Sequence, residues 1–226
     1  WETGMRSFVS GIIVIDDGGE RSHNCDIIID QNLCENADQR YKGLVPDTCK
    51  RLIGNRYVML SKEIIELKEK RFPSNHALVS FGGAYHPEVK KVTEAISTLE
   101  SNWEWSVILG IISDKEYQEV INNISPHITI HRYVNNMHDF LRTASLCIGA
   151  SGSSNWERFY LGVPQIIVPL YDNQLESANY IKKNNLAMVM NISETTSVET
   201  YRAIIKGCDK PSLERYIKHS SDFIDG

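Results

Sequence analysis

The residues from Gly149 to Gln174 constrain the fold more than any other part of the chain. Residues 145–148 predict a buried strand, and the small and hydroxylated residues 149–155 predict a loop. A helix follows, whose inner face is predicted from the spacing of Trp156, Phe159, Tyr160 and Val163. A second apolar strand, 165–168, comes directly after this helix. A strand, a helix and a strand in close succession indicate parallel strands joined by a right-handed crossover.

The same alternation of strands and helices extends over most of the chain after residue 73. Further strands are predicted at residues 76–81, 105–109, 128–131 and 187–190. Further helices are predicted at residues 87–99, 114–123, 137–143, 173–184, 198–206 and 212–219. This alternation predicts an α/β fold class, with a parallel sheet that carries helices on both faces.

The first 73 residues follow a different pattern. Two short apolar strands, within residues 12–15 and 25–32, end in acidic and polar side chains, and residues 33–56 read as polar and irregular. A charged helix at 61–70 leads into a linker around Pro73. We therefore expect two domains, 1–73 and 74–226. Because two strands are too few for a complete domain, we expect residues 1–73 to be the second half of an α/β domain whose first half precedes Trp1.

Composition excludes several classes of function. The net charge of −5 and the absence of a long basic run argue against binding to nucleic acid. Five scattered cysteines form no Cys-x-x-Cys pair and the seven histidines are dispersed, so we expect free thiols, a reducing cytoplasmic location and no metal site. The chain contains no apolar run of roughly 20 residues, the length that a membrane span needs, and no visible signal peptide.

Three loops are predicted to follow strands at one edge of the sheet, where α/β proteins bind ligands. They are Phe81–Ala84 with the pair Gly82 and Gly83, Tyr133–Asn136 with Val134, and Gly149–Asn155. Glycine lets a ligand approach the backbone, and the start of a helix offers free amide groups to phosphate oxygens. A hydrogen bond to a charged group contributes about 1.5–3 kcal/mol, against about 0.3–1 kcal/mol for the helix dipole. The donors that would decide diphosphate binding are therefore Ser153, Ser154 and Asn155.

Each of these patterns also has a purely structural interpretation. The sequence Ser154-x-x-Glu157 is a capping box, in which Glu157 folds back onto its own helix start. The pair Gly82–Gly83 is often only a turn, and it belongs neither to a Rossmann fingerprint nor to a P-loop. No Gly-x-Ser-x-Gly elbow surrounds the serines, which argues against a serine hydrolase.

Two further groups of polar residues have alternative interpretations. The segment Asp172-Asn173-Gln174 caps the next helix, or it offers amide groups to sugar hydroxyls. His23 lies near Asp16 and Asp30 in the sequence. One interpretation is that it acts as a general base, and the simpler one is that it is a polar loop residue.

Several of these stretches together resemble a known family, the UDP-sugar hydrolases of pseudaminic acid biosynthesis, also named spore-coat polysaccharide proteins of the SpsG type. The resemblance extends to about residue 190. Its motifs are Val14-Ile15-Asp16-Asp17, Arg21-x-His23-x-Cys25-Asp26, Ile28-Ile29-Asp30-Gln31-Asn32, Tyr41-x-Gly43-Leu44-Val45-Pro46, Ser80-Phe81-Gly82-Gly83, Gly149-Ala150-Ser151-Gly152-Ser153-Ser154-Asn155-Trp156-Glu157-Arg158, Leu161-Gly162-Val163-Pro164 and Asn173-Gln174.

The resemblance implies a two-lobed GT-B fold whose second lobe binds the UDP of a UDP-linked amino sugar. By analogy, Glu157 would bind the ribose hydroxyls, residues 153–155 the diphosphate, and the backbone near Val134 the uracil. Asn173 and Gln174 would face the sugar. The family hydrolyses the anomeric bond of a UDP-2,4-diacetamido-2,4,6-trideoxyhexose without a metal or another cofactor.

One departure from the family leaves the catalytic residue unknown. The histidine that serves as the proposed general base lies in a Gly-x-Gly-His-type motif near the family's N-terminus, and that motif is absent here. We therefore expect these 226 residues to bind UDP with little or no hydrolysis. The alternatives are a UDP-sugar glycosyltransferase of the same fold and a non-catalytic nucleotide-sugar binding module of a fused enzyme.

Overall fold

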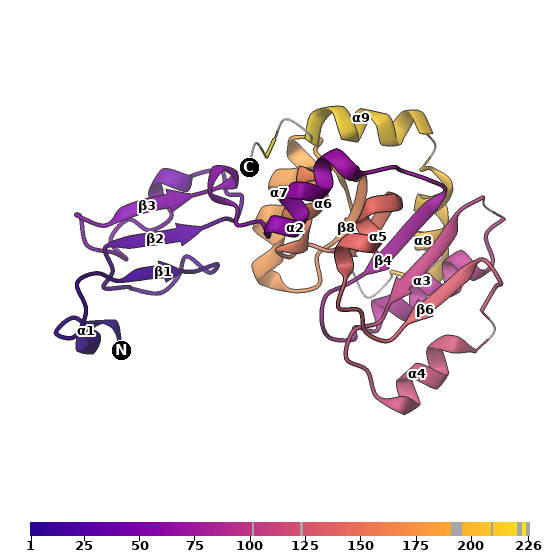
Figure 1. The fold of residues 1–226 in the computed structure, drawn as a ribbon, viewed down its shortest axis with the longest axis horizontal. Coiled ribbons are helices and arrows are strands. Elements are labelled where there is room, and N and C mark those ends of the chain that lie inside the picture. The colour runs from indigo at the N-terminus through magenta and orange to yellow at the C-terminus, as the bar shows by residue number, and fades with distance from the viewer. Residues whose placement is uncertain (101, 123, 191–195, 209, 221–222, 225–226) are drawn as a thin grey trace.

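A computed structural model describes residues 1–100, 102–122, 124–190, 196–208, 210–220 and 223–224. Figure 1 shows a small lobe with a three-stranded sheet and a larger lobe with a six-stranded sheet. In the small lobe, β1 (Ile13–Ile15), β2 (Ile27–Asp30) and β3 (Lys50–Ile53) run parallel in that order. The short helix α1 (Glu2–Met5) precedes them, and η1 (Ala37–Gln39) lies between β2 and β3.

A connecting segment leads from the small lobe to the large one. It contains η2 (Asn55–Tyr57), α2 (Lys62–Leu67) and η3 (Lys68–Lys70). The hydroxyl of Ser61 accepts a hydrogen bond from the Ile64 amide and so caps the start of α2. Ile64 and Leu67 of α2 are buried in the core of the large lobe, which anchors the connecting segment there.

The large lobe confirms the predicted α/β fold with parallel strands. Its strands are β4 (His76–Ser80), β5 (Glu104–Ile108), β6 (Ile128–His131), β7 (Ala144–Ala150), β8 (Gln165–Val168) and β9 (Met188–Val189). All neighbours pair in parallel, in the order β6-β5-β4-β7-β8-β9. The helices are α3 (Glu88–Ser97), α4 (Asp114–Ile121), α5 (Met137–Thr143), α6 (Ser154–Tyr160), η4 (Asp172–Gln174), α7 (Leu175–Lys183), α8 (Val198–Lys206) and α9 (Lys210–Ser220).

Two apolar layers cover the two faces of this sheet. Along β4, the side chains of Ala77 and Val79 enter one core and that of Leu78 enters the other, as the alternation of a strand requires. The first core contains residues of α3, α4 and α8, and the second contains residues of α2, α5, α6 and α7. The helices α6 and α7 therefore lie on the opposite face of the sheet from α3.

The sequence did not predict strand β3. Its residues Lys50 and Arg51 are exposed, and Leu52 and Ile53 are half-buried. A strand at the edge of a sheet has one side open to water, so its sequence lacks the apolar run of a central strand. At the N-terminus, the helix α1 spans only Glu2–Met5.

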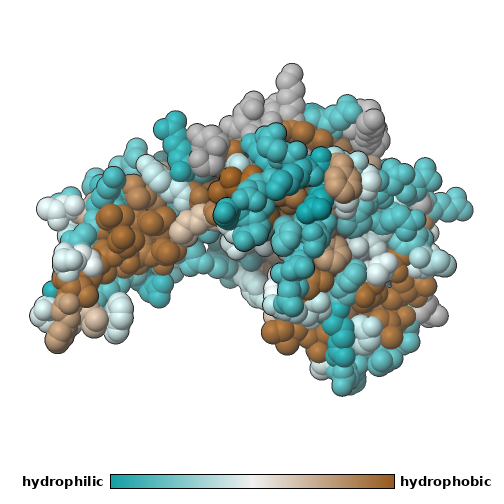
Figure 2. All heavy atoms as spheres, in the orientation of Figure 1, coloured by the Kyte–Doolittle hydropathy of each residue, from teal (hydrophilic) through white to brown (hydrophobic). Residues whose placement is uncertain are grey.

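One surface of the small lobe is apolar. Ile13 and Ile15 of β1 are more than 60% exposed, and Phe8 is 80% exposed. Figure 2 shows apolar side chains gathered over β1, β2 and β3 on the face turned to the viewer. Among the described residues, no helix is long and apolar enough to cross a membrane.

Candidate functional site

The strand order places a switch point between β4 and β7. The chain proceeds outward from β4 to β5 and β6, returns to the other side of β4 with β7, and then continues outward to β8 and β9. In parallel α/β sheets, the crevice at the carboxyl ends of two such strands is the usual ligand site. The loop after β4 contains Gly82 and Gly83, and the loop after β7 contains Gly152 and Ser153. The structure thus brings these four predicted residues to the two sides of the switch point.

Glycine is required at two positions around this crevice. Gly82 has a φ of +116°, a conformation that other residues rarely adopt. A Cβ on Gly149 would overlap the Ser80 carbonyl oxygen and lie 2.9 Å from Nη1 of Arg158, so β4 and β7 approach closely only because Gly149 has no side chain. By contrast, a Cβ on Gly82, Gly83 or Gly152 would have no neighbour within 4 Å. The strands are therefore tightly packed at Gly149, and the three loop glycines border open space.

The capping box predicted at the start of α6 does not form. Ser154 is the first helical residue, the cap position is Ser153, and the structure shows no side-chain capping bond there. Ser153 has helical dihedral angles, φ −56° and ψ −29°, whereas a capping residue is normally extended. The side chains of Ser153 and Ser154 are exposed, so their hydroxyls face solvent instead of the helix.

Asn155 has a different place from the one expected for a diphosphate donor. Its side chain is 1% exposed, its Nδ2 lies 3.4 Å from the Ser151 hydroxyl, and its Oδ1 accepts a hydrogen bond from Arg158. The Asn155 amide donates to the Gly152 carbonyl at 3.0 Å. The Asn155 side chain therefore supports the loop from within the protein, and the exposed hydroxyls of this segment are those of Ser153 and Ser154.

The Arg158 guanidinium holds the loop, α6 and β8 together. It is 3% exposed, and it donates to the Gln165 side chain at 2.7 Å and to the Ala150 carbonyl at 3.1 Å, in addition to Asn155. Gln165 in turn donates from Nε2 to the Asn155 carbonyl at 3.4 Å. Sequence reasoning did not assign this role to Arg158, although three acceptors, two of them buried, depend on it.

Glu157 faces a cavity of about 350 Å³ on the α5–α6 face of the large lobe. Asn135, the neighbour of Val134, contributes to the wall, and the connecting segment contributes Ser61 and Glu63. The other lining residues are Ile64, Met137 and His138. Burial raises the pKa of Glu157, and the adjacent Arg158 lowers it in part. The cavity brings together Glu157 and the loop of Val134, as expected, and it adds the segment between the lobes, which the sequence had not indicated.

Asn173 and Gln174 lie in η4, immediately after the loop that follows β8. Asn173 is exposed. The Oε1 atom of Gln174 accepts a hydrogen bond from the Leu170 amide at 2.9 Å, and Nε2 is the donor of the same side chain. Both residues lie at the same sheet edge as the crevice, one strand beyond β7.

The carboxyl ends of β1 and β2 hold a network of buried carboxylates. The Tyr41 hydroxyl lies 2.9 Å from Oδ2 of Asp16 and 2.9 Å from Oδ2 of Asp30. Arg21 pairs with Asp16 and Arg40 with Asp30, each at 2.6 Å. Burial raises the pKa of Asp16, but hydrogen bonds from Arg21, the Gly19 amide and Tyr41 outweigh this effect and bring it to about 2.

His23 lies beside this network. Its Nδ1 lies 2.8 Å from a carboxylate oxygen of Glu2, and its Nε2 lies 3.8 Å from Oδ2 of Asp16. The side chain is 8% exposed. The buried position fits a structural histidine better than a general base that must reach a substrate.

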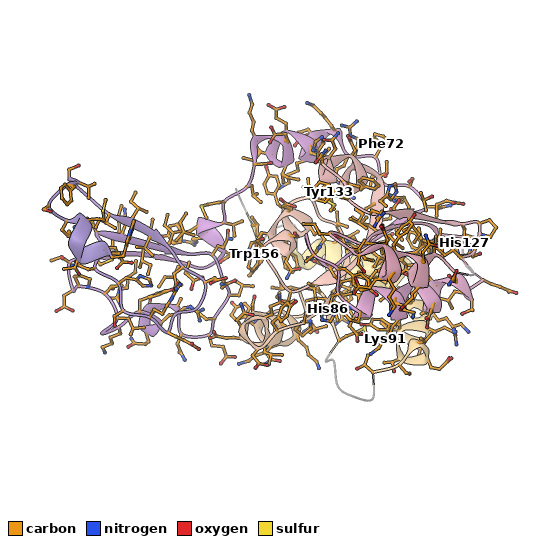
Figure 3. All side chains as sticks on the ribbon, turned by 90° about the horizontal axis from the view of Figure 1, so that it is seen from below. Phe72, His86, Lys91, His127, Tyr133 and Trp156 are labelled. Carbon is orange, nitrogen blue, oxygen red and sulfur yellow. The ribbon has the colours of Figure 1, made fainter. Side chains whose placement is uncertain are left out.

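Two ion pairs join α7 to the small lobe. Arg40 Nη1 lies 2.5 Å from the Glu176 carboxylate, and Lys183 Nζ lies 2.5 Å from that of Glu35. Figure 3 shows Trp156 of α6 on the side of the large lobe that faces the small one. The segment with Asn173 and Gln174 immediately precedes α7, the helix that these two ion pairs connect to the small lobe.

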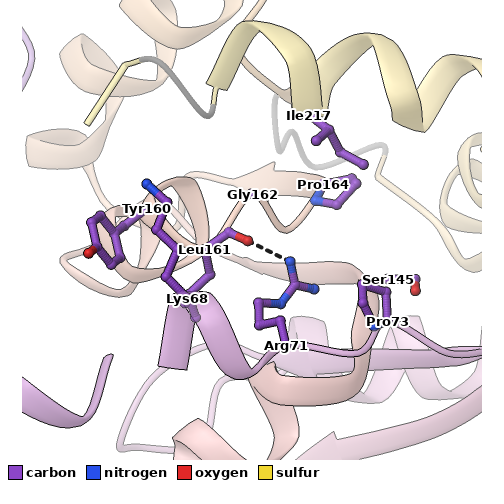
Figure 4. A pocket seen from close by; sticks show the side chains of 9 residues that line it. All are labelled: Lys68, Arg71, Pro73, Ser145, Tyr160, Leu161, Gly162, Pro164 and Ile217. Carbon is purple, nitrogen blue, oxygen red and sulfur yellow. Dashed lines mark hydrogen bonds between the residues drawn. The ribbon is translucent and has the colours of Figure 1, made fainter. Parts of the chain in front are cut away.

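Two other cavities lie at the opposite edge of the sheet. They have volumes of about 270 and 470 Å³ and share Pro73, Ser145, Pro164 and Ile217 in their walls. Figure 4 shows the smaller one, where Arg71 donates a hydrogen bond to the Leu161 carbonyl at 2.5 Å. Because Pro73 and Pro164 precede β4 and β8 and Ser145 is the second residue of β7, the cavities lie at the amino ends of the strands, away from the switch point.

Comparison with known proteins identifies the family. Residues 82–222 match the model of the glycosyltransferase family 28 C-terminal domain. The chain belongs to this family. The matched segment begins directly after β4 and contains the glycine- and serine-rich loops that follow β4 and β7.

Two curated proteins are similar to parts of this chain. The uncharacterized protein MJ1062 of Methanocaldococcus jannaschii is 27% identical over an alignment of 146 residues, and the match covers 58% of this chain and 29% of that protein. The UDP-N-acetylglucosamine–N-acetylmuramyl-(pentapeptide) pyrophosphoryl-undecaprenol N-acetylglucosamine transferase of Thermotoga neapolitana is 29% identical over 107 residues, 45% of this chain and 32% of that protein. The matches thus span about a third of the length of these relatives.

Solved structures of GT-B glycosyltransferases share the fold. MurG of Acinetobacter baumannii has a TM-score of 0.67 at 13% identity, over 99% of this chain and 65% of that chain. The UGT89C1 protein of Arabidopsis thaliana, complexed with UDP, has a TM-score of 0.68 at 10% identity, over 98% of this chain and 64% of that chain. The predicted GT-B-like fold is therefore confirmed.

Proposed function

We propose that this chain binds a UDP-linked amino sugar and is part of a glycosyltransferase that moves the sugar from UDP to an acceptor. In this proposal, residues 74–226 form the UDP-binding lobe, and residues 1–73 contribute to the other lobe and the linker. The observation that carries the proposal is the position of the matched family segment, whose glycine- and serine-rich loops lie on both sides of the switch point. The names of the relatives, which include a UDP-N-acetylglucosamine-dependent transferase, support the nucleotide and the sugar class.

The nucleoside occupies the cavity beside Glu157 in this proposal. The Glu157 carboxylate accepts hydrogen bonds from the ribose hydroxyls, and the backbone of the loop with Val134 contacts the uracil. The volume of about 350 Å³ supports the assignment, because it matches the lower range of small-molecule sites.

The diphosphate lies over the loop after β7. The hydroxyls of Ser153 and Ser154 and the amides at the start of α6 donate to its oxygens, and the absence of side chains at Gly82, Gly83 and Gly152 leaves space for it. Asn173 and the amide nitrogen of Gln174 face the sugar. Asn155 and Arg158 do not contact the ligand and instead hold the loop in place.

The second candidate is hydrolysis of a UDP-2,4-diacetamido-2,4,6-trideoxyhexose in pseudaminic acid synthesis. The motifs of the small lobe support it, since Asp16, Asp30 and Tyr41 of those motifs form one hydrogen-bonded network. The two candidates differ in their need for an acceptor. UDP release should be measured with a UDP-diacetamido sugar and with UDP-N-acetylglucosamine, each with and without acceptor saccharides. Turnover that requires an acceptor supports the transferase, and equal turnover without one supports the hydrolase.

We also propose a cytoplasmic location. The supporting observation is that Cys25, Cys34, Cys49 and Cys147 form no disulfide, which is typical of proteins in a reducing compartment.

Titration calorimetry tests the site itself. UDP should bind to the wild-type protein, and Glu157→Gln should weaken UDP binding about tenfold or more, because a hydrogen bond to a charged group is worth about 1.5–3 kcal/mol. Glu104→Gln is the matched control, since Glu104 is exposed at the amino end of β5 and should leave binding unchanged. No heat with UDP, or equal affinities in Glu157→Gln and the wild type, would contradict the proposed site.

A further inference from the structure

The diphosphate site contains few basic side chains. The five loops that follow β4 to β8 span residues 81–87, 109–113, 132–136, 151–153 and 169–174, and their only basic side chains are His86 and Arg132. Arg132 pairs with the Asp114 carboxylate at 2.6 Å, and its guanidinium carbon lies 4.6 Å from the centre of the Tyr117 ring. Arg132 is thus engaged outside the crevice, which leaves His86 as the basic side chain of these loops for a diphosphate.

His86 lies across the carboxyl end of β7. The imidazole ring packs edge to face against Tyr171, with ring centres 6.0 Å apart and an interplanar angle of 85°. His86 belongs to the loop after β4, and Tyr171 belongs to the loop after β8. Because β7 separates β4 from β8 in the sheet, a contact between these two loops must pass over the end of β7. His86 therefore borders the crevice at the switch point.

A backbone contact determines which nitrogen of the His86 ring carries the hydrogen. The Glu88 amide donates a hydrogen bond to Nδ1 of His86 at 3.2 Å, so Nδ1 is an acceptor and Nε2 carries the hydrogen in the neutral ring. Burial lowers the pKa of His86, with smaller effects from Glu88, which raises it, and Lys91, which lowers it. A neutral ring with Nε2–H is a hydrogen-bond donor to an anion.

The position of His86 also indicates which part of the ligand it contacts. The nucleoside cavity with Glu157 lies on the face of the sheet that α5 and α6 cover. His86 enters from the loop that leads to α3 on the other face, and its partner Tyr171 stands two residues before Asn173, which is proposed for the sugar. His86 thus lies at the end of the ligand that is far from the ribose.

From these observations we infer that His86, placed by Tyr171, donates a hydrogen bond from Nε2 to the terminal phosphate of the nucleoside diphosphate, where the sugar is attached. His86 selects a diphosphate over a monophosphate. The inference rests on the proposed function, because it deepens the description of the same nucleotide site. Sequence reasoning missed His86 because the contact joins two residues 85 positions apart.

The test compares UDP with UMP, which lacks the terminal phosphate. Titration calorimetry is carried out on the wild type, His86→Ala, His86→Gln and the control His127→Ala. His127 lies before β6 at the amino edge of the sheet, where it contacts Ser125 and the Ile96 carbonyl. His86→Ala should weaken UDP binding about tenfold or more and UMP binding less than twofold, as expected for a lost hydrogen bond to a charged group. His86→Gln, which retains a donor, should recover part of the UDP affinity, and His127→Ala should match the wild type.

Two kinds of result would overturn the inference. Equal weakening of UDP and UMP in His86→Ala would mean that His86 only supports the loop, and unchanged UDP affinity would mean that it makes no contact. If the wild type binds UDP, Glu157→Gln weakens it and His86→Ala does not, the inference fails and the proposed function stands. If the wild type does not bind UDP, both fail.

Discussion

Gly149→Ala should severely destabilise the large lobe. Gly149 is buried in the centre of the six-stranded sheet, where it pairs with Ser80 of β4 and Ile167 of β8. A methyl group there would overlap the Ser80 carbonyl oxygen and lie 2.9 Å from Nη1 of Arg158. Neither neighbour can move easily, since one is strand backbone and the other is held by three hydrogen bonds.

The expected magnitude follows from these contacts. Overpacking of a core costs about 1–3 kcal/mol, and because both neighbours are fixed we expect a loss near the upper end, about 3 kcal/mol. Gly152→Ala is the matched control, because its new methyl group meets no atom within 4 Å. A surface change of this kind alters the free energy of unfolding by about 0.5 kcal/mol or less.

Urea unfolding followed by tryptophan fluorescence measures both variants. Trp103, Trp105 and Trp156 all lie in the large lobe, so the signal reports on the lobe in question. Gly149→Ala should unfold at a clearly lower urea concentration than Gly152→Ala with a similar slope. Equal midpoints for the two variants would refute the close approach of β4 and β7 at the switch point.

Three further predictions concern other parts of the molecule. Arg158→Lys should lower the free energy of unfolding by about 1–3 kcal/mol in urea titrations, because a lysine cannot satisfy the acceptors on Asn155, Ala150 and Gln165 together. A variant as stable as the wild type would contradict this prediction. The pKa of Asp16 is lowered to about 2, so the ionised carboxylate stabilises the fold above about pH 4. Roughly 2 kcal/mol of the free energy of unfolding should be lost as the pH falls from about 4 to about 2. In acid unfolding experiments, Asp16→Asn should not show this pH-dependent loss of stability. In thiol labelling of the native protein, the half-buried Cys34 should react before the buried Cys25, Cys49, Cys147 and Cys208, and equal labelling rates would contradict the packing.

The fold class could be predicted because the large lobe repeats one simple pattern. Buried parallel strands give short apolar runs such as 145–148 and 165–168, and amphipathic helices separate them, so alternation alone implies the parallel sheet. Strand β3 was not predicted because its sequence has no apolar run. Its pairing with β2 defines it as a strand.

The candidate site could be predicted only in part. The glycines at positions 82, 83 and 152 were visible because a loop after a buried strand has a known place at the sheet edge. The direction of the Asn155 side chain could not be predicted, because it depends on contacts with Arg158 and with Gln165 of the next strand. The capping box at Ser154 was a misleading local pattern, because the dihedral angles of Ser153 start the helix one residue too early for it.

Resonance mapping shows directly whether UDP binds at the switch point. UDP is titrated into ¹⁵N-labelled protein, and the shifts of the backbone amide signals are followed. We expect shifts at Gly82, Gly83, Ser153 and Ser154, at the carboxyl ends of β4 and β7, and none at Arg71 or Ser145 beside the cavities of the opposite edge. Shifts confined to Arg71 and Ser145, with the four crevice residues unchanged, would contradict this expectation.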